Sequence, residues 1–554
     1  MKTIPSICAL LCQAMPAGLA LALGCLAPAG AENGSVDGPG SATPAVPVFT
    51  LNNPSPARNE LFGHAVAISG ARLVVGVPGI AGAGTNPPAG GAYVYDLAGP
   101  APTQPVATFP GSTSDYSGYA VAISGQRVVV GENGGSFPVP INGKATVRDL
   151  AGGGAVVLRS PFQTRDDHYG SAVAISGTRV VVGASGHIFG AVRDIGRAYV
   201  YDLASGTPTV PVATLENPSP TQGDFFGYAV AISGTRVVVG AYGDETGAPD
   251  AGSAYVYDLT SGTPAVPVAT LPNPHPVAQD QFGSAVAISG TRVVVGSVGD
   301  DTGAFAAGSA YVYDLANATP AVPVLTLHNP DPVSVGLFGN SVAISDGRVV
   351  IGAYGNAPGG SAYVYALDGA TPTVPVAALH NPGPAAGDSF GWSVAIDGPT
   401  IAIGTPFDYN AATDNGSVYV FGPHPLDQDS DGLLDSWELS YWPSTTGHGP
   451  LDDEDHDGYV DLLELALGLN PTIPDHASLL TVEGGYLTMT LTKHPGATYQ
   501  VQSAGTLLPA QPESFSASST TMLIDNPTTL KVRDNIPIGT PPSRFLRLKV
   551  TAAP

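Results

Sequence analysis

The chain has 554 residues, of which 71 are glycine, 53 are proline and only 12% are charged. This composition argues against a helical bundle and favours many short strands joined by tight turns. The formal net charge of −25 argues against a nucleic-acid-binding protein, whose contact surface is basic, and suits an extracellular protein. No internal apolar run is long enough to span a membrane, so we expect no transmembrane segment in the mature chain.

The first 31 residues are predicted to be a secretory signal peptide. Lys2 gives a positive start, an apolar stretch runs to Leu26, and residues 29–31 are small, which places cleavage after Ala31. A lipid anchor on Cys25 is the alternative. All three cysteines lie in this segment, so we expect a secreted or cell-surface protein that has no disulfide after cleavage.

A polar leader (32–42) is followed by a motif that recurs seven times over residues 43–421. Each copy begins at a Phe-Gly pair or its equivalent, and the copies are 52–57 residues apart. This period matches a four-stranded propeller blade, so the chain is predicted to be mainly β, with a seven-bladed β-propeller. The anchors are Phe62-Gly63, Ser117-Gly118, Tyr169-Gly170, Phe226-Gly227, Phe282-Gly283, Phe338-Gly339 and Phe390-Gly391.

The fourth copy predicts the strands of one blade. Residues 229–233 alternate as strand a, and residues 236–240 form a β-branched strand b that we expect to be buried on both faces. Residues 253–258 alternate as strand c. Residues 263–271 are predicted to be strand d, and their two prolines place it at the outer edge of the blade.

The two ends of the array predict how the ring closes. Residues 43–51 resemble a strand d but precede the first anchor, whereas no strand d follows the last strand c at 417–421. We therefore expect residues 43–51 to pair with residues 417–421 and to complete the last blade.

The Phe-Gly anchors and the Val-Gly-Ala stretch that ends strand b resemble FG-GAP repeats, the blades of the propeller in integrin α chains and related bacterial secreted proteins. The resemblance covers residues 43–421 and implies the same seven-bladed fold. Calcium-binding FG-GAP blades carry an Asp-rich loop between strands a and b. That connection is Ser-Gly-Thr in the fourth copy, too short for an ion cage, so blade calcium sites are not expected.

Residues 422–472 contain two acidic twelve-residue loops, 427–438 and 453–464. Each has oxygen ligands at positions 1, 3, 5, 7, 9 and 12 and glycine at position 6, the pattern that gathers six to eight oxygens around Ca²⁺. Position 7 contributes a backbone carbonyl. The predicted ligands are Asp427, Asp429, Asp431, Leu433, Asp435 and Glu438 in the first loop, and Asp453, Asp455, Asp457, Tyr459, Asp461 and Glu464 in the second.

A short helix is expected after each calcium loop, but the prolines at 422–425 leave no room for a helix before the first. The unit resembles dockerin or thrombospondin type 3 calcium repeats. We expect Ca²⁺ to stiffen this stalk.

Residues 478–554 are predicted to form a small β-sandwich, with strands at 486–492, 498–503, 520–524, 530–532 and 544–550. Residues 495–502 and 544–548 resemble a fibronectin type III module. Because a fold alone does not give a function, two roles stay open for this module: it binds glycans, or it only ends the chain.

The sequence contains no recognisable catalytic set, so the primary hypothesis is a monomeric, non-enzymatic binding or adhesion protein for an extracellular protein or glycan. The alternatives are a glycan- or polymer-processing enzyme with its site in the propeller mouth, and an envelope structural protein. The long b–c and d–a loops leave the blade on one face, where loops on a rigid scaffold commonly carry function. Candidate ligand-facing residues are Tyr242, Asp244, Glu245, Asp250, Asp300 and Asp301.

The arginines that open strand b and the aspartates that close strand c are expected to pair within each blade, with a structural role.

Overall fold

The computed structural model describes residues 47–422 except 56–59, 80–88, 100, 114–115, 135–142, 163–166, 187–193, 386 and 409–414. It also describes residues 7–10, Tyr441, Thr472 and the strands between residues 480 and 552. The chain divides into two compact units, one made of Pro39–Gly422 and the other of Met1–Gly38 with Pro423–Pro554.

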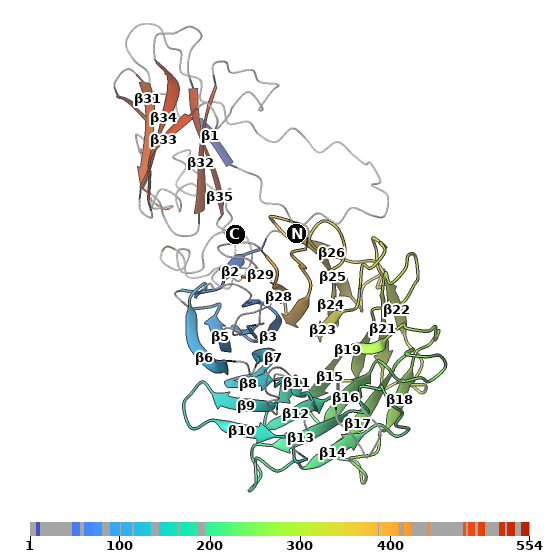
Figure 1. Ribbon diagram of the computed structural model, residues 1–554. Helices are drawn as coiled ribbons and strands as arrows, with labels where there is room; N and C mark the ends of the chain where they lie inside the picture. Colours follow the sequence, from blue (N-terminus) through green and yellow to red (C-terminus); the bar gives the residue numbers. More distant parts are fainter. Residues whose placement is uncertain are drawn as a thin grey trace. The chain divides into compact units, whose positions relative to one another are not determined.

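The first unit is a seven-bladed propeller in which every blade is a four-stranded antiparallel sheet (Figure 1). The first three blades are β3 (Ala65–Ser69), β4 (Arg72–Val77), β5 (Ala89–Asp96) and β6 (Pro105–Thr113); β7 (Ser117–Ser124), β8 (Arg127–Glu132), β9 (Lys144–Asp149) and β10 (Val156–Arg159); and β11 (Tyr169–Ser176), β12 (Arg179–Ala184), β13 (Arg197–Asp202) and β14 (Ala213–Glu216). The next three are β15 (Ala229–Ser233), β16 (Arg236–Ala241), β17 (Ser253–Asp258) and β18 (Ala269–Pro272); β19 (Phe282–Ser289), β20 (Arg292–Ser297), β21 (Ser309–Asp314) and β22 (Leu325–His328); and β23 (Ser341–Ser345), β24 (Arg348–Ala353), β25 (Ser361–Ala366) and β26 (Ala377–His380).

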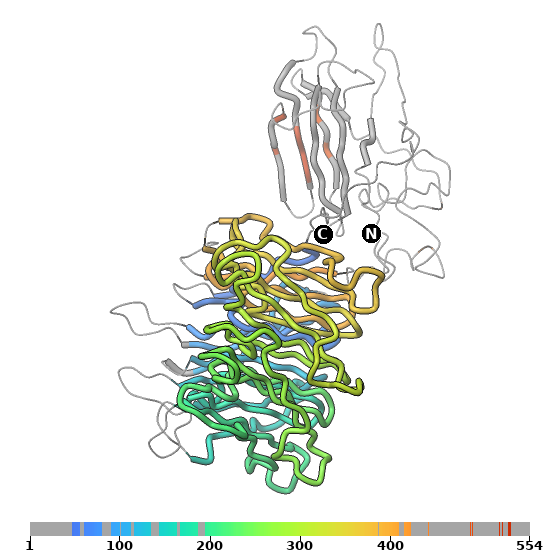
Figure 2. Tube along the Cα trace, turned by 90° about the vertical axis from the view of Figure 1, so that its right-hand side faces the viewer, coloured from blue at the N-terminus to red at the C-terminus, as the bar shows by residue number. Residues whose placement is uncertain are grey.

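The seventh blade combines both ends of the array. β27 (Ser393–Asp397), β28 (Thr400–Thr405) and β29 (Ser417–Phe421) pair in sequence, and β2 (Phe49–Asn52) pairs antiparallel with β29, Leu51 facing Val418. Figure 2 shows the blue β2 beside the orange strands of this blade. Each strand a contacts the strand a of the next blade, and β27 contacts β3, so the ring closes as the sequence predicts.

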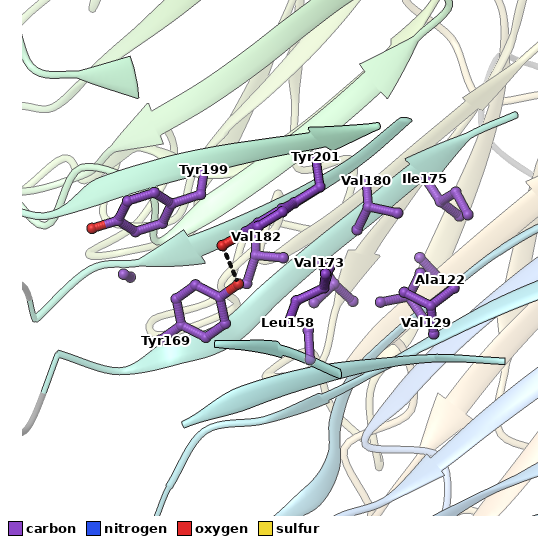
Figure 3. Close-up of a cluster of buried hydrophobic side chains, with 13 residues drawn as sticks. Ala122, Val129, Leu158, Tyr169, Val173, Ile175, Val180, Val182, Tyr199 and Tyr201 are labelled. Carbon is purple, nitrogen blue, oxygen red and sulfur yellow. Dashed lines mark hydrogen bonds between the residues drawn. The ribbon is translucent and has the colours of Figure 1, made fainter. Parts of the chain in front are cut away.

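The core lies between neighbouring blades because strands b and c have apolar side chains on both faces. In the fourth blade all of β16 after Arg236 is buried, and the first five residues of β17 are buried too. Between the second and third blades, Val129 and Leu158 pack with Val180 and Tyr201, and the Tyr169 hydroxyl donates a hydrogen bond to the Tyr201 hydroxyl at 2.8 Å (Figure 3). The fully buried strand b is thus confirmed.

The Phe-Gly anchor sets the spacing between blades. Phe226 is fully buried and meets Tyr257 edge to face, with ring centroids 6.3 Å apart. Gly227 has φ +89°, which favours glycine. Gly240, near the end of strand b, lies against the anchor of the next blade, and a Cβ built there would stand 2.0 Å from the carbonyl oxygen of Gly283. Both glycines therefore have a packing role.

Strand d of the fourth blade is shorter than the sequence predicts. Residues 263–271 were expected to be strand, but β18 covers only Ala269–Pro272. Residues 264–266 form a turn, in which the Val266 amide donates to the Thr263 carbonyl at 2.9 Å, and the chain joins the sheet when the Val268 amide donates to Val256. Pro264 and Pro267 both precede the strand, where they are not required to donate a ladder hydrogen bond.

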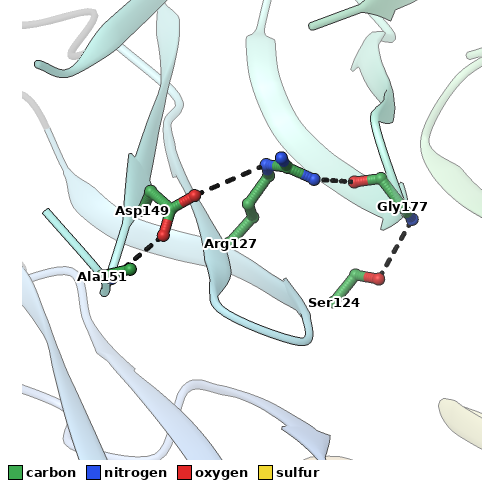
Figure 4. Close-up of polar contacts among 5 residues, drawn as sticks. All are labelled: Ser124, Arg127, Asp149, Ala151 and Gly177. Atoms are coloured by element: carbon green, nitrogen blue, oxygen red, sulfur yellow. Dashed lines mark hydrogen bonds and ion pairs between the residues drawn. The ribbon is translucent and has the colours of Figure 1, made fainter. Parts of the chain in front are cut away.

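A polar belt joins successive blades at the a–b turns. The last side chain of strand a accepts a hydrogen bond from the amide of the turn glycine in the next blade, as the Ser124 hydroxyl does from Gly177 at 3.0 Å (Figure 4). Asp397 of the last blade accepts from Gly70 of the first at 2.6 Å, which carries the belt across the closure. The acceptors are Ser69, Ser124, Ser176, Ser233, Ser345 and Asp397.

The arginines that open strand b contribute to this belt. Arg127 lies opposite Asp149 and forms an ion pair with it at 3.7 Å, while its guanidinium also donates to the Gly177 carbonyl of the next blade at 3.3 Å (Figure 4). Arg292 instead forms a bidentate pair with Asp368 of the sixth blade. The predicted arginines and aspartates lie opposite each other in register, and the predicted ion pair within a blade is present for Arg72–Asp96 and Arg127–Asp149. Arginines of this row also connect blades.

The second unit contains two antiparallel sheets. One has the order β30 (Leu480–Glu483), β31 (Tyr486–Thr492), β34 (Thr529–Pro537) and β33 (Thr520–Asn526), and the other has β1 (Ile7–Leu10), β35 (Phe545–Ala552) and β32 (Ala497–Ala504). The predicted C-terminal strands are therefore present. In the described part of the chain, the structure has no helix with the length and apolar character needed to cross a membrane.

Candidate functional site

The b–c and d–a loops leave the blades on one face, which we call the loop face. It is opposite the polar belt because strands a to d run alternately in each sheet. On this face the seven copies differ in loop length and in side chains, so it is the place to look for a site.

Two of the predicted acidic residues on the loop face are turned inward. Asp244 is 4% exposed and accepts hydrogen bonds from the Tyr255 hydroxyl at 2.5 Å and the Thr246 amide at 2.9 Å. Asp300 accepts from the Tyr311 hydroxyl at 2.9 Å and the Thr302 amide at 2.8 Å. Both carboxylates therefore fix the b–c loop to strand c.

The other predicted residues lie nearer the surface. Glu245, Asp250 and Asp301 are exposed, and Asp301 accepts a hydrogen bond from the Ala306 amide at 2.8 Å. Tyr242 is half-buried among other aromatic rings. The structure does not bring the five acidic residues together into one cluster: in the described part of the chain, no group of three His, Cys, Asp or Glu side chains is placed to hold a metal ion.

A second carboxylate in several blades fixes the d–a loop. The Asn217 amide donates to Asp224 at 2.7 Å, and the Thr221 amide donates to the same carboxylate at 2.6 Å. Burial raises the pKa of Asp224. The same contact, with an acid seven residues after an asparagine, recurs as Asn53–Glu60, Asn273–Asp280 and Asn381–Asp388.

Aromatic rings gather where the innermost strands begin on the loop face. We call this group the aromatic collar, and it consists of His64, Tyr119, Phe225, Tyr228, Tyr242, Tyr354, Trp392 and Phe407. Four members occupy the position after the Phe-Gly anchor, where strand a starts, and the others lie in the d–a loop or just after strand b.

The collar extends across the blades. The ring of His64 lies 4.7 Å from that of Tyr119 in the second blade and 5.6 Å from that of Trp392 in the seventh. Trp392 lies 4.8 Å from Tyr354 of the sixth blade. In the fourth blade, the ring of Tyr228 lies 4.6 Å from that of Tyr242 at a steep angle. Ring contacts thus connect the first, second, sixth and seventh blades. The rings of the fourth blade form a second cluster, whose Tyr228 acts electrostatically on Tyr119 and Tyr354.

The collar carries no charge of its own at neutral pH. Burial lowers the pKa of His64 to about 4, and its Nδ1 lies 3.1 Å from the Tyr119 carbonyl oxygen, so this nitrogen donates. Burial, and then the nearby Tyr228 hydroxyl, raise the pKa of Tyr119 to about 12. The same two causes raise the pKa of Tyr242 to about 12. The collar therefore offers neutral hydroxyls and apolar ring faces.

The remaining blades carry small or polar side chains at the position after the anchor. These residues are Ser171, Ser284 and Asn340, and the Asn340 amide donates to the Trp392 carbonyl at 3.0 Å. The sequence prediction found Tyr242 but not the rest of the collar. The sequence signal for the collar is the position after the Phe-Gly anchor, which is His, Tyr, Ser, Asn or Trp at the start of an otherwise constant strand.

The predicted calcium ligands at 427–438 and 453–464 all lie outside the described residues. Both loops therefore stay a sequence prediction.

Comparison with known proteins identifies the repeats. Five segments, residues 163–201, 212–257, 268–313, 325–365 and 374–421, match the FG-GAP repeat family. The chain is also similar to the β-propeller domain of the Trilobed protease from Pyrococcus furiosus, with 12% sequence identity and a TM-score of 0.38, over 61% of this chain and 90% of that one. No curated protein matches the chain.

Proposed function

We propose that this seven-bladed propeller with FG-GAP repeats is a secreted or cell-surface binding protein of the adhesion type, without catalytic activity. The observation that carries the proposal is the contrast between the two faces of the ring. The polar belt repeats the same contacts from blade to blade, whereas the loop face varies around a rigid frame. Such variation on a fixed scaffold is typical of binding proteins.

The ligand is an extracellular protein or a glycan, since a net charge of −25 disfavours nucleic acid. The test is capture of glycan arrays and extracellular-matrix proteins by the full chain, with and without calcium. We expect saturable binding to one of these classes. The proposal would be contradicted if the full chain bound no glycan and no matrix protein, whether calcium is present or absent.

We also propose that Ca²⁺ binds the loops at 427–438 and 453–464 and stiffens the stalk between the propeller and the C-terminal module. Twelve-residue loops of this kind in extracellular modules bind at roughly 10⁻⁴–10⁻³ M. Limited proteolysis of the full chain should therefore cut faster within residues 427–470 after EDTA is added.

The matched control is the double variant Glu438→Gln and Glu464→Gln, which removes the final ligand of each loop. It should be cut at the fast rate both with and without calcium. Equal cutting of the wild-type chain in the two conditions would show that calcium does not stiffen this segment.

A further inference from the structure

We propose that the aromatic collar binds a neutral sugar ring of an extracellular glycan. This inference rests on the proposed binding function and narrows its ligand. Sugar-binding sites need flat apolar surfaces for the C–H face of the ring and neutral hydrogen-bonding groups for its hydroxyls, and the collar has both.

The apolar surfaces lie at different angles. Phe225 and Tyr242 are stacked with an interplanar angle of 3°, while Tyr228 meets Tyr242 at 72°. Trp392 is tilted by 52° from Tyr354. Tyr228 is 44% exposed, so a ligand can reach it without displacing core side chains. Inclined rings of this kind can contact more than one face of a bulky, puckered ring.

The polar groups of the collar are neutral hydroxyls that come from different blades. Tyr119, Tyr228 and Tyr354 come from the second, fourth and sixth blades, yet the Tyr228 hydroxyl acts electrostatically on both of the others. A tyrosine hydroxyl donates one hydrogen bond and accepts others, as a sugar hydroxyl does. Neutral hydroxyls from three blades can therefore serve as hydrogen-bond partners for a polyhydroxylated ligand.

Two of the carboxylates on the loop face are already engaged, which leaves fewer of them for a cationic ligand. Aromatic rings also bind cations directly. Here Asp244 and Asp300 already accept hydrogen bonds from tyrosine and threonine within their own blades. Asp194 and Asp250 act electrostatically on Tyr242, so a cationic ligand is the competing outcome of the test.

Trp392 provides a direct reporter for the collar. The other two tryptophans are Trp437 and Trp442, both after the propeller, and neither is a predicted calcium ligand. In a Trp437→Phe, Trp442→Phe background, the emission of Trp392 would be measured during titration with neutral hexose and N-acetylhexosamine oligosaccharides. Tetramethylammonium and a lysine-rich peptide serve as cationic comparators. Titration calorimetry on the chain with its natural tryptophans makes the same comparison of ligands without the two tryptophan substitutions.

The variants are Tyr228→Ala in the collar and Phe305→Ala as the matched control. Phe305 is a 66% exposed aromatic residue in a b–c loop of the fifth blade and is not a collar member. We expect a neutral oligosaccharide to change Trp392 emission saturably, Tyr228→Ala to weaken binding at least tenfold, and Phe305→Ala to leave it unchanged. Circular dichroism confirms that each variant is folded.

Two results would overturn the inference: sugar affinity that is unchanged in Tyr228→Ala, or a Trp392 response to the cationic comparators alone. The capture screen separates this inference from the proposed function. If the full chain captures a glycan or matrix protein while Trp392 does not respond to sugar, the collar inference fails and the binding function stands. If nothing is captured, both fail.

Discussion

The two ends of strand b differ in how much their surroundings vary from blade to blade. At the belt end, Arg127 and its equivalents in other blades contact the next blade through the same polar groups. At the loop-face end, Gly240 and its equivalents pack against the next anchor, and the residues just beyond them vary. The contacts between blades are thus similar around the ring, and the sequence begins to vary just beyond the loop-face end of strand b.

On the proposed function, the belt end of strand b contributes to stability and the loop-face end to ligand binding. Belt residues are half-exposed or exposed, and each hydrogen bond between blades is worth about 1 kcal/mol. The belt therefore stabilises the ring through the number of these bonds. The collar depends on a few large side chains that differ between blades. Substitutions at the two ends should therefore have different consequences for stability and for binding.

The largest effect is expected at the glycine that spaces the blades. Gly240→Ala would place a methyl group 2.0 Å from the Gly283 carbonyl oxygen, so neighbouring blades must move apart. We expect a loss of about 3 kcal/mol in the free energy of unfolding, at the upper end for overpacking because the contact is with backbone. Urea denaturation measures it.

Gly262→Ala in the same blade is the matched control. Gly262 lies in the c–d turn, and a Cβ there meets nothing within 4 Å. Its effect should stay within about 0.5 kcal/mol. Equal losses in the two variants would mean that blade spacing does not depend on the glycine of strand b.

A smaller, pH-dependent effect is expected at His64 in the collar. Its pKa falls from 6.5 to about 4 on folding because burial disfavours the charged form. The unfolded chain therefore binds the proton more tightly, and stability is lost as the pH drops from about 6.5 to about 4. His64→Gln should flatten this part of the stability curve by about 2.5 kcal/mol.

Thermal unfolding across this pH range measures the difference between variant and wild type. His275→Gln, at an exposed position in a d–a loop, serves as the control and should follow the wild-type curve. Parallel curves for wild type and His64→Gln would contradict the burial of a neutral imidazole in the collar.

The smallest effect is expected in the belt. Ser124→Ala removes the acceptor for the Gly177 amide, which is exposed and can bond to water instead. The loss should be about 0.5–1 kcal/mol, and the variant should bind any collar ligand with unchanged affinity. Urea denaturation and the sugar titration check the two parts. A binding defect in this variant would show that the belt end of strand b also affects ligand binding at the collar.

The sequence predicts most of the propeller because one repeat carries the information for seven blades. The β-branched run Arg236–Gly240 identified the buried strand b, and the surplus strand before the first anchor predicted the pairing of β2 with β29. Strand d was predicted too long because a repeated Pro-Ala-Val-Pro stretch looks extended although it forms a turn.

The loop face was harder to predict because spacing does not show which way a side chain points. Asp244 and Asp300 looked like ligand-facing acids, but Tyr255 and Tyr311 of strand c bind them inside the blade. The collar was missed because its members come from five blades, and contacts such as those of His64 with Tyr119 and Trp392 form only when the blades stand side by side in the ring.

The pairing of β2 with β29 also has a consequence for how the chain folds. The Ser417 hydroxyl donates to the Asn52 side chain at 3.2 Å, across 365 residues of sequence. At about 5–20 residues per second, a ribosome needs roughly 20–70 seconds to make that distance, and β2 has no partner strand during this time. A contact so distant in sequence forms late. We therefore expect a slow final folding phase in which the seventh blade is completed.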